Sequence, residues 1–343
     1  MTAPIIELRD VSKRFTRTLD AAEKVANIFG AGLSEKTVHA VDGVSLSVAE
    51  GEVVGLVGES GCGKSTLGRI VAGIHEASDG EVLFRGKEIG AMSAAERRAA
   101  QLAVQMIFQD PMSSLNPRLR VSDIVGEAPR YHGLVTGREL DAYLDDLLGR
   151  VGLDPAYKRR YAHQFSGGQR QRIGIARALA VKPDFLVCDE SVAALDVSIQ
   201  AQVINLFMRL REELGLTYLF ISHDLGVVEH ISDRVVIMYL GRVVESASVA
   251  EVFARANHPY TQALLAEVPR IDQRKRSFAA IKGEIPSPVN PPPGCHFHPR
   301  CPHAHERCRV EVPALREIAP GHISACHLND EVAPRRSVAM ETA

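Results

Sequence analysis

The sequence lacks a strong excess of charge of either sign and lacks long apolar runs. Its 343 residues carry 40 Lys and Arg against 42 Asp and Glu, a formal net charge of −2. Domains that coat nucleic acid usually carry a marked basic excess, so this balance argues against that class. No apolar run reaches the roughly 18–20 residues that a membrane-spanning helix needs, and no signal-peptide pattern opens the chain. We therefore expect a cytosolic protein.

The sequence also has no internal repeat and no C-x-x-C pair. The missing repeat predicts a single copy of each functional unit. Six cysteines are present, and in a cytosolic chain these are core, metal-binding or redox residues rather than disulfides. Apolar residues make up 45%, enough for one large domain with a full core and a smaller second one.

What the sequence does contain is a glycine-rich loop that follows the apolar run at residues 53–57. The loop fits the pattern G-x-x-x-x-G-K-[ST], and a helical pattern follows it. Such a loop curls so that its N–H groups face nucleotide phosphates, and the helix start adds partial positive charge. A plain glycine-rich turn is the alternative, but the flanking strand and helix favour a nucleoside triphosphate site. The loop residues are Gly58, Glu59, Ser60, Gly61, Cys62, Gly63, Lys64, Ser65 and Thr66.

Two carboxylates end a second apolar run, at residues 185–188. Asp189 is placed to hold Mg²⁺ through water, beside the Ser65 hydroxyl, and Glu190 to polarise an attacking water. A solvated acidic pair is the alternative. Other apolar runs predict strands at residues 5–14, 40–48, 81–84, 104–108 and 217–221, those at 185–188 and 217–221 being buried and parallel.

A second anion-binding helix start lies at Ser166, Gly167, Gly168 and Gln169. One triphosphate needs only one phosphate-binding loop, and the loop at residues 58–66 already provides it. This second site is therefore expected to bind a nucleotide held by a neighbouring subunit. An ordinary N-capped helix is the alternative.

These segments together resemble the ATP-binding subunits of ABC transporters, over residues 5 to about 250. Residues 58–66 are similar to the Walker A loop, residues 185–190 to Walker B, and residues 165–169 to the family signature, with Phe165 where Leu is commoner. Further matches are Gln109 to the Q-loop, Asp196 to the D-loop and His223 to the H-loop.

The resemblance implies an α/β fold: a P-loop NTPase core of ABC type with antiparallel β and helical subdomains, plus a small Cys-rich C-terminal extension. The expected ATP-binding domain is 1–256, with an insertion at about 16–37 and a helical subdomain at about 110–180. Residues 257–330 form the expected importer-type C-terminal region, and 331–343 a disordered tail.

The resemblance also implies a mechanism with two subunits arranged head to tail and each ATP between them. Lys64 then neutralises the β- and γ-phosphates, and His223 contacts the γ-phosphate and holds the water in line for Glu190. Ser166 and Gly168 reach the γ-phosphate from the partner. Mg²⁺ is expected at Ser65, Gln109 and Asp189. The region of Gln109 is also expected to sense the γ-phosphate and to meet the coupling helices of the membrane subunits, a polar loop Gln without either task being the alternative. Asp196 and Gln169 join the nucleotide site at the subunit interface.

Phe15 matches the aromatic residue that stacks on adenine in the family. Phe29 or His39 could take that role instead, and an ordinary exposed or core Phe is the further alternative. Two positions depart from the family pattern: Ser191 stands where Pro is common, and Ala193 where the D-loop normally begins with Ser. The lost hydroxyl puts the hydrolysis rate and the symmetry of the two sites in doubt, but not the fold.

Residues 258–265 (His-Pro-Tyr-Thr-Gln-Ala-Leu-Leu) resemble the motif of the oligopeptide/dipeptide and nickel importer ATPases. This implies an ATPase that powers peptide import from the cytoplasmic face of the membrane, as a peripheral subunit. Its implied partners are a second ATP-binding subunit (itself or a sister chain), two permease subunits and, indirectly, a substrate-binding protein, with no nucleic acid. Nickel, glutathione or another small solute are alternative cargos. A soluble ABC ATPase acting on nucleic acid and a regulator without turnover are alternative functions.

Four cysteines lie in a short segment rich in Pro and His, spaced x5, x6 and x17. Four thiolates in a segment with few apolar residues indicate a small module that a bound metal stabilises in place of a hydrophobic core. The resemblance implies a [4Fe-4S] cluster, with zinc (using His296, His298, His303 or His305) or free thiols as alternatives. The four are Cys295, Cys301, Cys308 and Cys326; Cys62 and Cys188 are expected to be non-ligands.

Overall fold

The computed structural model describes residues 4–30, 32, 34–110, 114–193, 195–267 and 283–330. The expected tail at 331–343 and the Pro111 position of the Q-loop segment lie outside the described residues. The main sheet has the strand order β11-β12-β10-β9-β3-β8-β7-β6.

Five strands of this sheet run parallel: β6, β7, β8, β3 and β9. Every residue of β3, β7 and β8 is buried, which is the expected state of parallel strands covered on both faces. The strand predictions at 185–188 and 217–221 are thus confirmed. The bounds are β3 Val53–Val57, β6 Val104–Ile107, β7 Phe185–Asp189, β8 Thr217–Ser222 and β9 Arg234–Tyr239.

A second, antiparallel sheet has the order β2-β1-β4-β5. Helix α2 (Lys64–Val71) lies between the two sheets, because its Leu67 and Ile70 share a core with Ile6 of β1 and Ile221 of β8. The antiparallel β subdomain expected from the family resemblance is therefore present. Its strands are β1 Pro4–Arg17, β2 Lys36–Ala49, β4 Asp79–Phe84 and β5 Lys87–Glu88.

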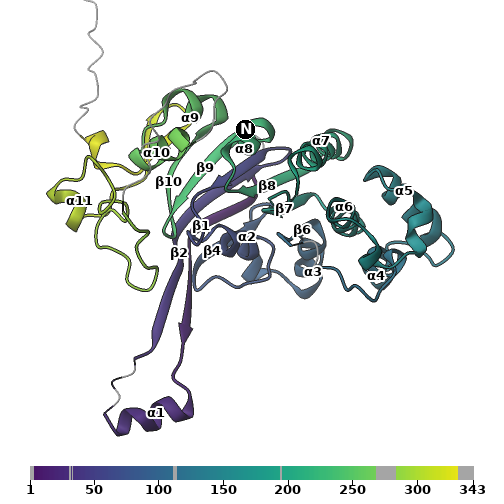
Figure 1. The fold of residues 1–343 in the computed structure, drawn as a ribbon, viewed down its shortest axis with the longest axis horizontal. Coiled ribbons are helices and arrows are strands. Elements are labelled where there is room, and N and C mark those ends of the chain that lie inside the picture. The colour runs from purple at the N-terminus through teal and green to yellow at the C-terminus, as the bar shows by residue number, and fades with distance from the viewer. Residues whose placement is uncertain are drawn as a thin grey trace, which may run out of the picture.

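The far ends of β1 and β2 form an arm that projects from the molecule (Figure 1). Their pairing continues to Arg17 opposite Lys36, and helix α1 (Ala21–Ile28) lies beyond it. Helix α1 lies within the insertion expected at about 16–37.

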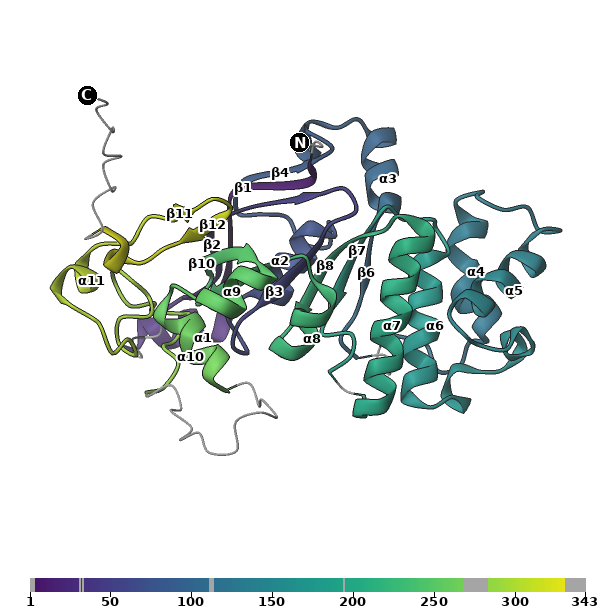
Figure 2. The same ribbon diagram turned by 90° about the horizontal axis from the view of Figure 1, so that it is seen from above.

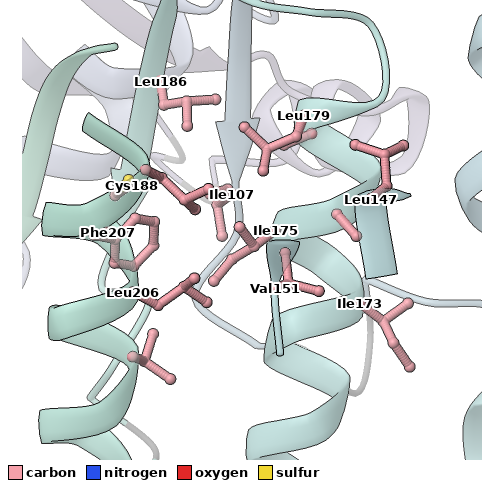
Figure 3. Close-up of a cluster of buried hydrophobic side chains, with 14 of the residues drawn as sticks. Ile107, Leu147, Val151, Ile173, Ile175, Leu179, Leu186, Cys188, Leu206 and Phe207 are labelled. Atoms are coloured by element: carbon pink, nitrogen blue, oxygen red, sulfur yellow. The ribbon is translucent and has the colours of Figure 1, made fainter. Parts of the chain in front are cut away.

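Residues 114–180 are mostly helical, as predicted, and lie at the opposite end of the molecule from the Cys-containing segment (Figures 1 and 2). Their apolar faces pack with α7 and the β7 side of the main sheet, as Leu147, Ile175, Leu186 and Phe207 illustrate (Figure 3). The helices of this span are α4 Val121–Tyr131, α5 Leu140–Arg150 and α6 Gly167–Leu179, with 3₁₀ turns at Pro155–Arg159 and Ala162–Gln164; α3 Ala94–Ala103 precedes the span in the chain and α7 Val197–Leu214 follows it.

The C-terminal segment extends the main sheet. Strand β12 (His322–Ser324) pairs with β10 (Arg242–Ser248), and the buried Glu245 carboxylate accepts hydrogen bonds from the His258 N–H (2.9 Å) and pairs with His322 Nε2 (2.7 Å). Phe297 completes a core with Tyr239 and Tyr260. The remaining elements are α8 Leu225–Ile231, α9 Val249–Arg255, α10 Pro259–Glu267, α11 Glu306–Val310, β11 Arg316–Ala319 and a 3₁₀ turn at His327–Asp330.

Candidate nucleotide-binding site

The carboxyl ends of four parallel strands lie at one edge of the main sheet. The register sets Val57 beside Ser222, Ile221 beside Asp189, and Cys188 beside Ile107. The loops that follow β3, β6, β7 and β8 therefore meet at this edge, which is where open α/β sheets place their ligands.

The loop at residues 58–66 joins β3 to α2 in a conformation that only glycine allows at two points. Gly63 has φ +105°, and a Cβ there would lie 2.0 Å from the Ala40 carbonyl oxygen. A Cβ at Gly58 would lie 2.2 Å from the Met238 carbonyl oxygen. Main chain approaches both glycines too closely for a side chain, so the curled shape of the loop depends on them.

The Lys64 side chain folds back across this loop. It is 4% exposed, and its Nζ donates to the carbonyl oxygens of Gly58 (2.7 Å) and Glu59 (3.0 Å). The ammonium group is thus held at the mouth of the curl, within the ring of backbone that would surround a phosphate.

Ser65 and Asp189 meet, as the sequence predicted. Ser65 Oγ donates to Asp189 Oδ1 at 2.7 Å, and Asp189 is 2% exposed. Burial raises the pKa of the Asp189 carboxyl, against the opposing effect of the Ser65 hydrogen bond. A hydroxyl and a carboxylate side by side are hard oxygen donors of the kind that Mg²⁺ prefers, so these residues fit that ion.

Glu190, Gln109 and His223 also come together at this edge. Gln109 Nε2 donates to Glu190 Oε2 at 2.8 Å, and His223 Nδ1 lies 3.3 Å from the same oxygen. Glu190 has φ +43°, uncommon for a residue with a side chain, and its N–H donates to the Ile221 carbonyl oxygen at 3.0 Å. Such backbone strain is often found where a side chain must be aimed at a reaction.

The segment at residues 166–169 begins α6 with a capping box. Ser166 Oγ accepts from the Gln169 N–H at 3.4 Å, and Gln169 Oε1 accepts from the Ser166 N–H at 3.1 Å. Ser166 is exposed and Phe165 is buried against Tyr157, which explains how an aromatic ring is accommodated there. Asp196 is exposed at the start of α7.

Phe15 is 40% exposed, with its ring edge-on to His75 at 5.6 Å between centroids. Two residues earlier, Lys13 pairs with Val41, which follows the Ala40 that contacts Gly63. Phe15 thus lies on the strand beside the loop. Of the two alternatives, His39 pairs with Arg14, and Phe29 follows α1 on the arm.

The four C-terminal cysteines are neighbours. Burial, followed by the charges of Cys308, Cys301 and Cys326, raises the pKa of Cys295 to about 11. Yet across the described ranges, no group of three or more His, Cys, Asp or Glu side chains is placed to hold a metal ion. The arrangement gives no support for the predicted iron–sulfur cluster or for zinc, and both remain predictions. Cys62 and Cys188 are buried in the core.

Two residues at this site were missed from the sequence. The Arg300 guanidinium binds both oxygens of the Glu59 carboxylate, at 2.6 and 2.9 Å, and Tyr260 Oη accepts from the Glu59 N–H at 2.9 Å. Tyr260 belongs to the motif at residues 258–265, but nothing in that motif indicated a contact with the phosphate loop.

Comparison with known proteins identifies two regions. Residues 41–193 match the family model described as ABC transporter, and residues 244–308 match that of the oligopeptide/dipeptide transporter C-terminal region. Within the part of the chain that the structure describes, no helix is long and apolar enough to cross a membrane.

Similar proteins cover most of the chain. The oligopeptide transport ATP-binding protein AppF of Bacillus subtilis is 50% identical, over 94% of this chain and 97% of its own length. A putative peptide import ATP-binding protein of Brucella ovis is 52% identical, over 84% and 92% respectively. Among solved structures, CbiO1 from Clostridium perfringens, part of the transporter complex CbiONQ, has a TM-score of 0.60 and 27% identity, over 74% of this chain and 92% of that one. The dimeric ABC cassette MJ0796 bound to ADP and Pi has a TM-score of 0.58 and 26% identity, over 71% and 98%.

Proposed function

Because this chain belongs to the ATP-binding subunits of ABC transporters, in the oligopeptide/dipeptide group, we propose that it hydrolyses ATP to power the import of peptides across a membrane. The observation that carries the proposal is the meeting of Gln109, Glu190 and His223 beside the phosphate loop, in a chain 50% identical to an oligopeptide transport protein.

The phosphate loop binds the triphosphate. Lys64 exchanges its two carbonyl partners for β- and γ-phosphate oxygens, where its charge opposes the charge that develops during transfer. Ser65, Asp189 and Gln109 would hold Mg²⁺, which would neutralise phosphate charge. The Phe15 ring offers a half-exposed face for adenine.

Glu190 orients and polarises the attacking water. Its carboxylate is fixed by Gln109 and His223, so it keeps one direction relative to the loop. His223 is 56% exposed, which leaves its ring accessible to the γ-phosphate.

The exposed start of α6 supplies the second half of the site, in trans. Ser166 and the Gly168 N–H reach the γ-phosphate bound by another subunit, with Gly167, Gln169 and Asp196 at the same interface. The solved MJ0796 cassettes are dimeric, which supports the pairing of two such subunits. ATP then favours the closed pair, and hydrolysis opens it.

Peptide is the proposed cargo because the relatives' names specify peptide or oligopeptide. Nickel, glutathione and other small solutes remain alternatives, since none of the residues discussed touches cargo. The C-terminal match at residues 244–308 favours a transporter over a soluble ABC ATPase that acts on nucleic acid. We place the subunit at the cytoplasmic face of the membrane, with a second ATP-binding subunit, two permease subunits and, indirectly, a substrate-binding protein.

For the C-terminal cysteines, the proposal of a [4Fe-4S] cluster depends on the donor set alone. Four thiols within one short segment suit this cluster, and the histidines nearby also suit zinc. Analysis of iron, acid-labile sulfide and zinc in anaerobically purified protein separates these two outcomes from free thiols.

The transport proposal is tested by purifying the chain with its membrane partners and measuring ATP-dependent uptake into proteoliposomes. Peptides, nickel and glutathione are supplied in separate assays. Peptide uptake that requires ATP and is lost in Lys64→Ala is expected. Uptake of nickel or glutathione alone would overturn the choice of cargo, and a Mg·ATP-bound Glu190→Gln variant that never forms a pair would overturn the two-subunit site.

A further inference from the structure

The C-terminal segment reaches the phosphate loop through one buried charge pair. The Arg300 side chain is 4% exposed, and its Nη1 and Nη2 donate to Glu59 Oε2 and Oε1 at 2.6 and 2.9 Å. The two residues are 241 positions apart, and Glu59 is the second residue of the loop. A planar, bidentate pair of this kind fixes direction as well as distance.

The turn that carries Arg300 is packed against the protein core. Phe297 is 1% exposed and packs against Tyr239 and Tyr260, with ring centroids 5.2 and 5.3 Å away. The Arg300 N–H donates to the Phe297 carbonyl oxygen at 3.0 Å, and Arg300 Nη1 also donates to Tyr239 Oη at 3.4 Å. The guanidinium is therefore positioned by an aromatic platform rather than by a free side chain.

All the polar groups of Glu59 have partners. Its carboxylate binds Arg300, its N–H donates to Tyr260 Oη at 2.9 Å, and its carbonyl oxygen accepts from Lys64 Nζ at 3.0 Å. Because the Lys64 ammonium group donates to the main-chain carbonyl oxygen of Glu59, the position of the Glu59 backbone influences the position of that ammonium group. A carboxylate at the mouth of an anion site would also repel phosphate, and Arg300 neutralises it.

We propose that Arg300 is a positioning residue for ATP: it holds and neutralises Glu59, and thereby keeps the phosphate loop and Lys64 ready for the triphosphate. This inference rests on the proposed function, since it assumes that ATP binds at residues 58–66. It makes the C-terminal region a working part of the nucleotide site, in addition to its place in the sheet.

The test compares variants of the full-length chain by their Kd for Mg·ATP, measured by calorimetry, and by their melting temperature. Arg300→Met is expected to raise the Kd about tenfold, which corresponds to about 1.4 kcal/mol. Arg300→Met combined with Glu59→Gln is expected to recover part of the affinity, because no unpaired carboxylate then faces the phosphates. Arg307→Met is the control: it removes an Arg of the same segment whose partners, Glu311 and Asp330, lie outside the phosphate loop, and its Kd is expected to stay within about twofold of wild type.

A structural role alone would lower the melting temperature and leave the Kd unchanged. A Kd for Arg300→Met within about twofold of wild type, at a temperature where the variant is folded, therefore overturns the proposal. If Arg300→Met does not fold, Arg300→Gln, which keeps a polar side chain but removes both the charge and the two-pronged contact, is measured instead: a raised Kd supports the proposal and an unchanged Kd overturns it. Wild type that fails to bind Mg·ATP overturns the proposed function itself, so the two failures are distinguishable.

Discussion

Replacing Glu190 by Gln is expected to stop hydrolysis while leaving nucleotide binding intact. The amide keeps the size of the side chain and one carbonyl oxygen, which can still accept the hydrogen bond that Gln109 Nε2 gives at 2.8 Å. It cannot accept a proton from water. Loss of a positioned general base costs about 10²–10⁴ in rate, which is about 2.7–5.4 kcal/mol in the barrier.

The same substitution should change stability little. Glu190 is 13% exposed, and a charge-assisted hydrogen bond is exchanged for a neutral one, a difference of about 1 kcal/mol. Affinity for Mg·ATP should be kept or improved, since one negative charge near the phosphates is removed. The variant therefore separates binding from chemistry.

The assay is steady-state ATP hydrolysis, with Mg·ATP affinity and melting temperature measured on the same preparations. Glu229→Gln is the matched control, because Glu229 is an exposed carboxylate on α8. We expect wild-type turnover from this control. If Glu190→Gln keeps more than about a tenth of wild-type kcat, a factor too small for loss of a general base, then Glu190 is not the group that polarises the water.

Three further predictions concern neighbouring groups. His223→Ala removes a ring 3.3 Å from Glu190 Oε2 and should lower kcat by about 10²–10³ with little change in KM, measured by steady-state kinetics. Asp189 has a raised pKa from burial, so the nucleotide-free protein loses stability as pH rises from the unfolded pKa of about 3.9 through the folded one. Asp189→Asn should therefore raise the melting temperature of nucleotide-free protein near neutral pH, while the extra stabilisation by Mg·ATP shrinks; a lower melting temperature without nucleotide would contradict this. The pKa of Cys295 is raised to about 11, so its alkylation in metal-free protein, followed by mass spectrometry, should be slow near neutral pH and accelerate toward that value.

The parts of the site that sequence could predict are those coded within a few residues. The loop at 58–66 needs glycine where another part of the main chain passes close by. At Gly63, for example, a Cβ atom would lie only 2.0 Å from the Ala40 carbonyl oxygen. The capping box at Ser166 and Gln169 is likewise a local device. Buried parallel strands follow from short, unbroken apolar runs, and their parallel register then brings Asp189 and His223 to one edge.

The unusual backbone of Glu190 could not be predicted in this way. Its φ of +43° is imposed by its surroundings, where its N–H bonds to Ile221 of the neighbouring strand. No residue type at position 190 signals this, since Glu has no preference for the left-handed region. The strain depends on how β7 and β8 lie together, and that is a property of the fold.

The Arg300–Glu59 pair could not be predicted from the sequence, because it joins two distant segments that meet only in the folded chain. Arg300 lies among Pro, His and Cys residues that indicate metal binding, and Glu59 occupies a variable position of the loop pattern. From the sequence, either residue alone would be expected to be an ordinary surface charge. Their pairing depends on the seating of Phe297 against Tyr239 and Tyr260, and hence on β9, α10 and the Cys-containing turn folding as one core. A segment that a motif assigns to one task can therefore contribute to another site, and the contact becomes visible only when the chain is folded.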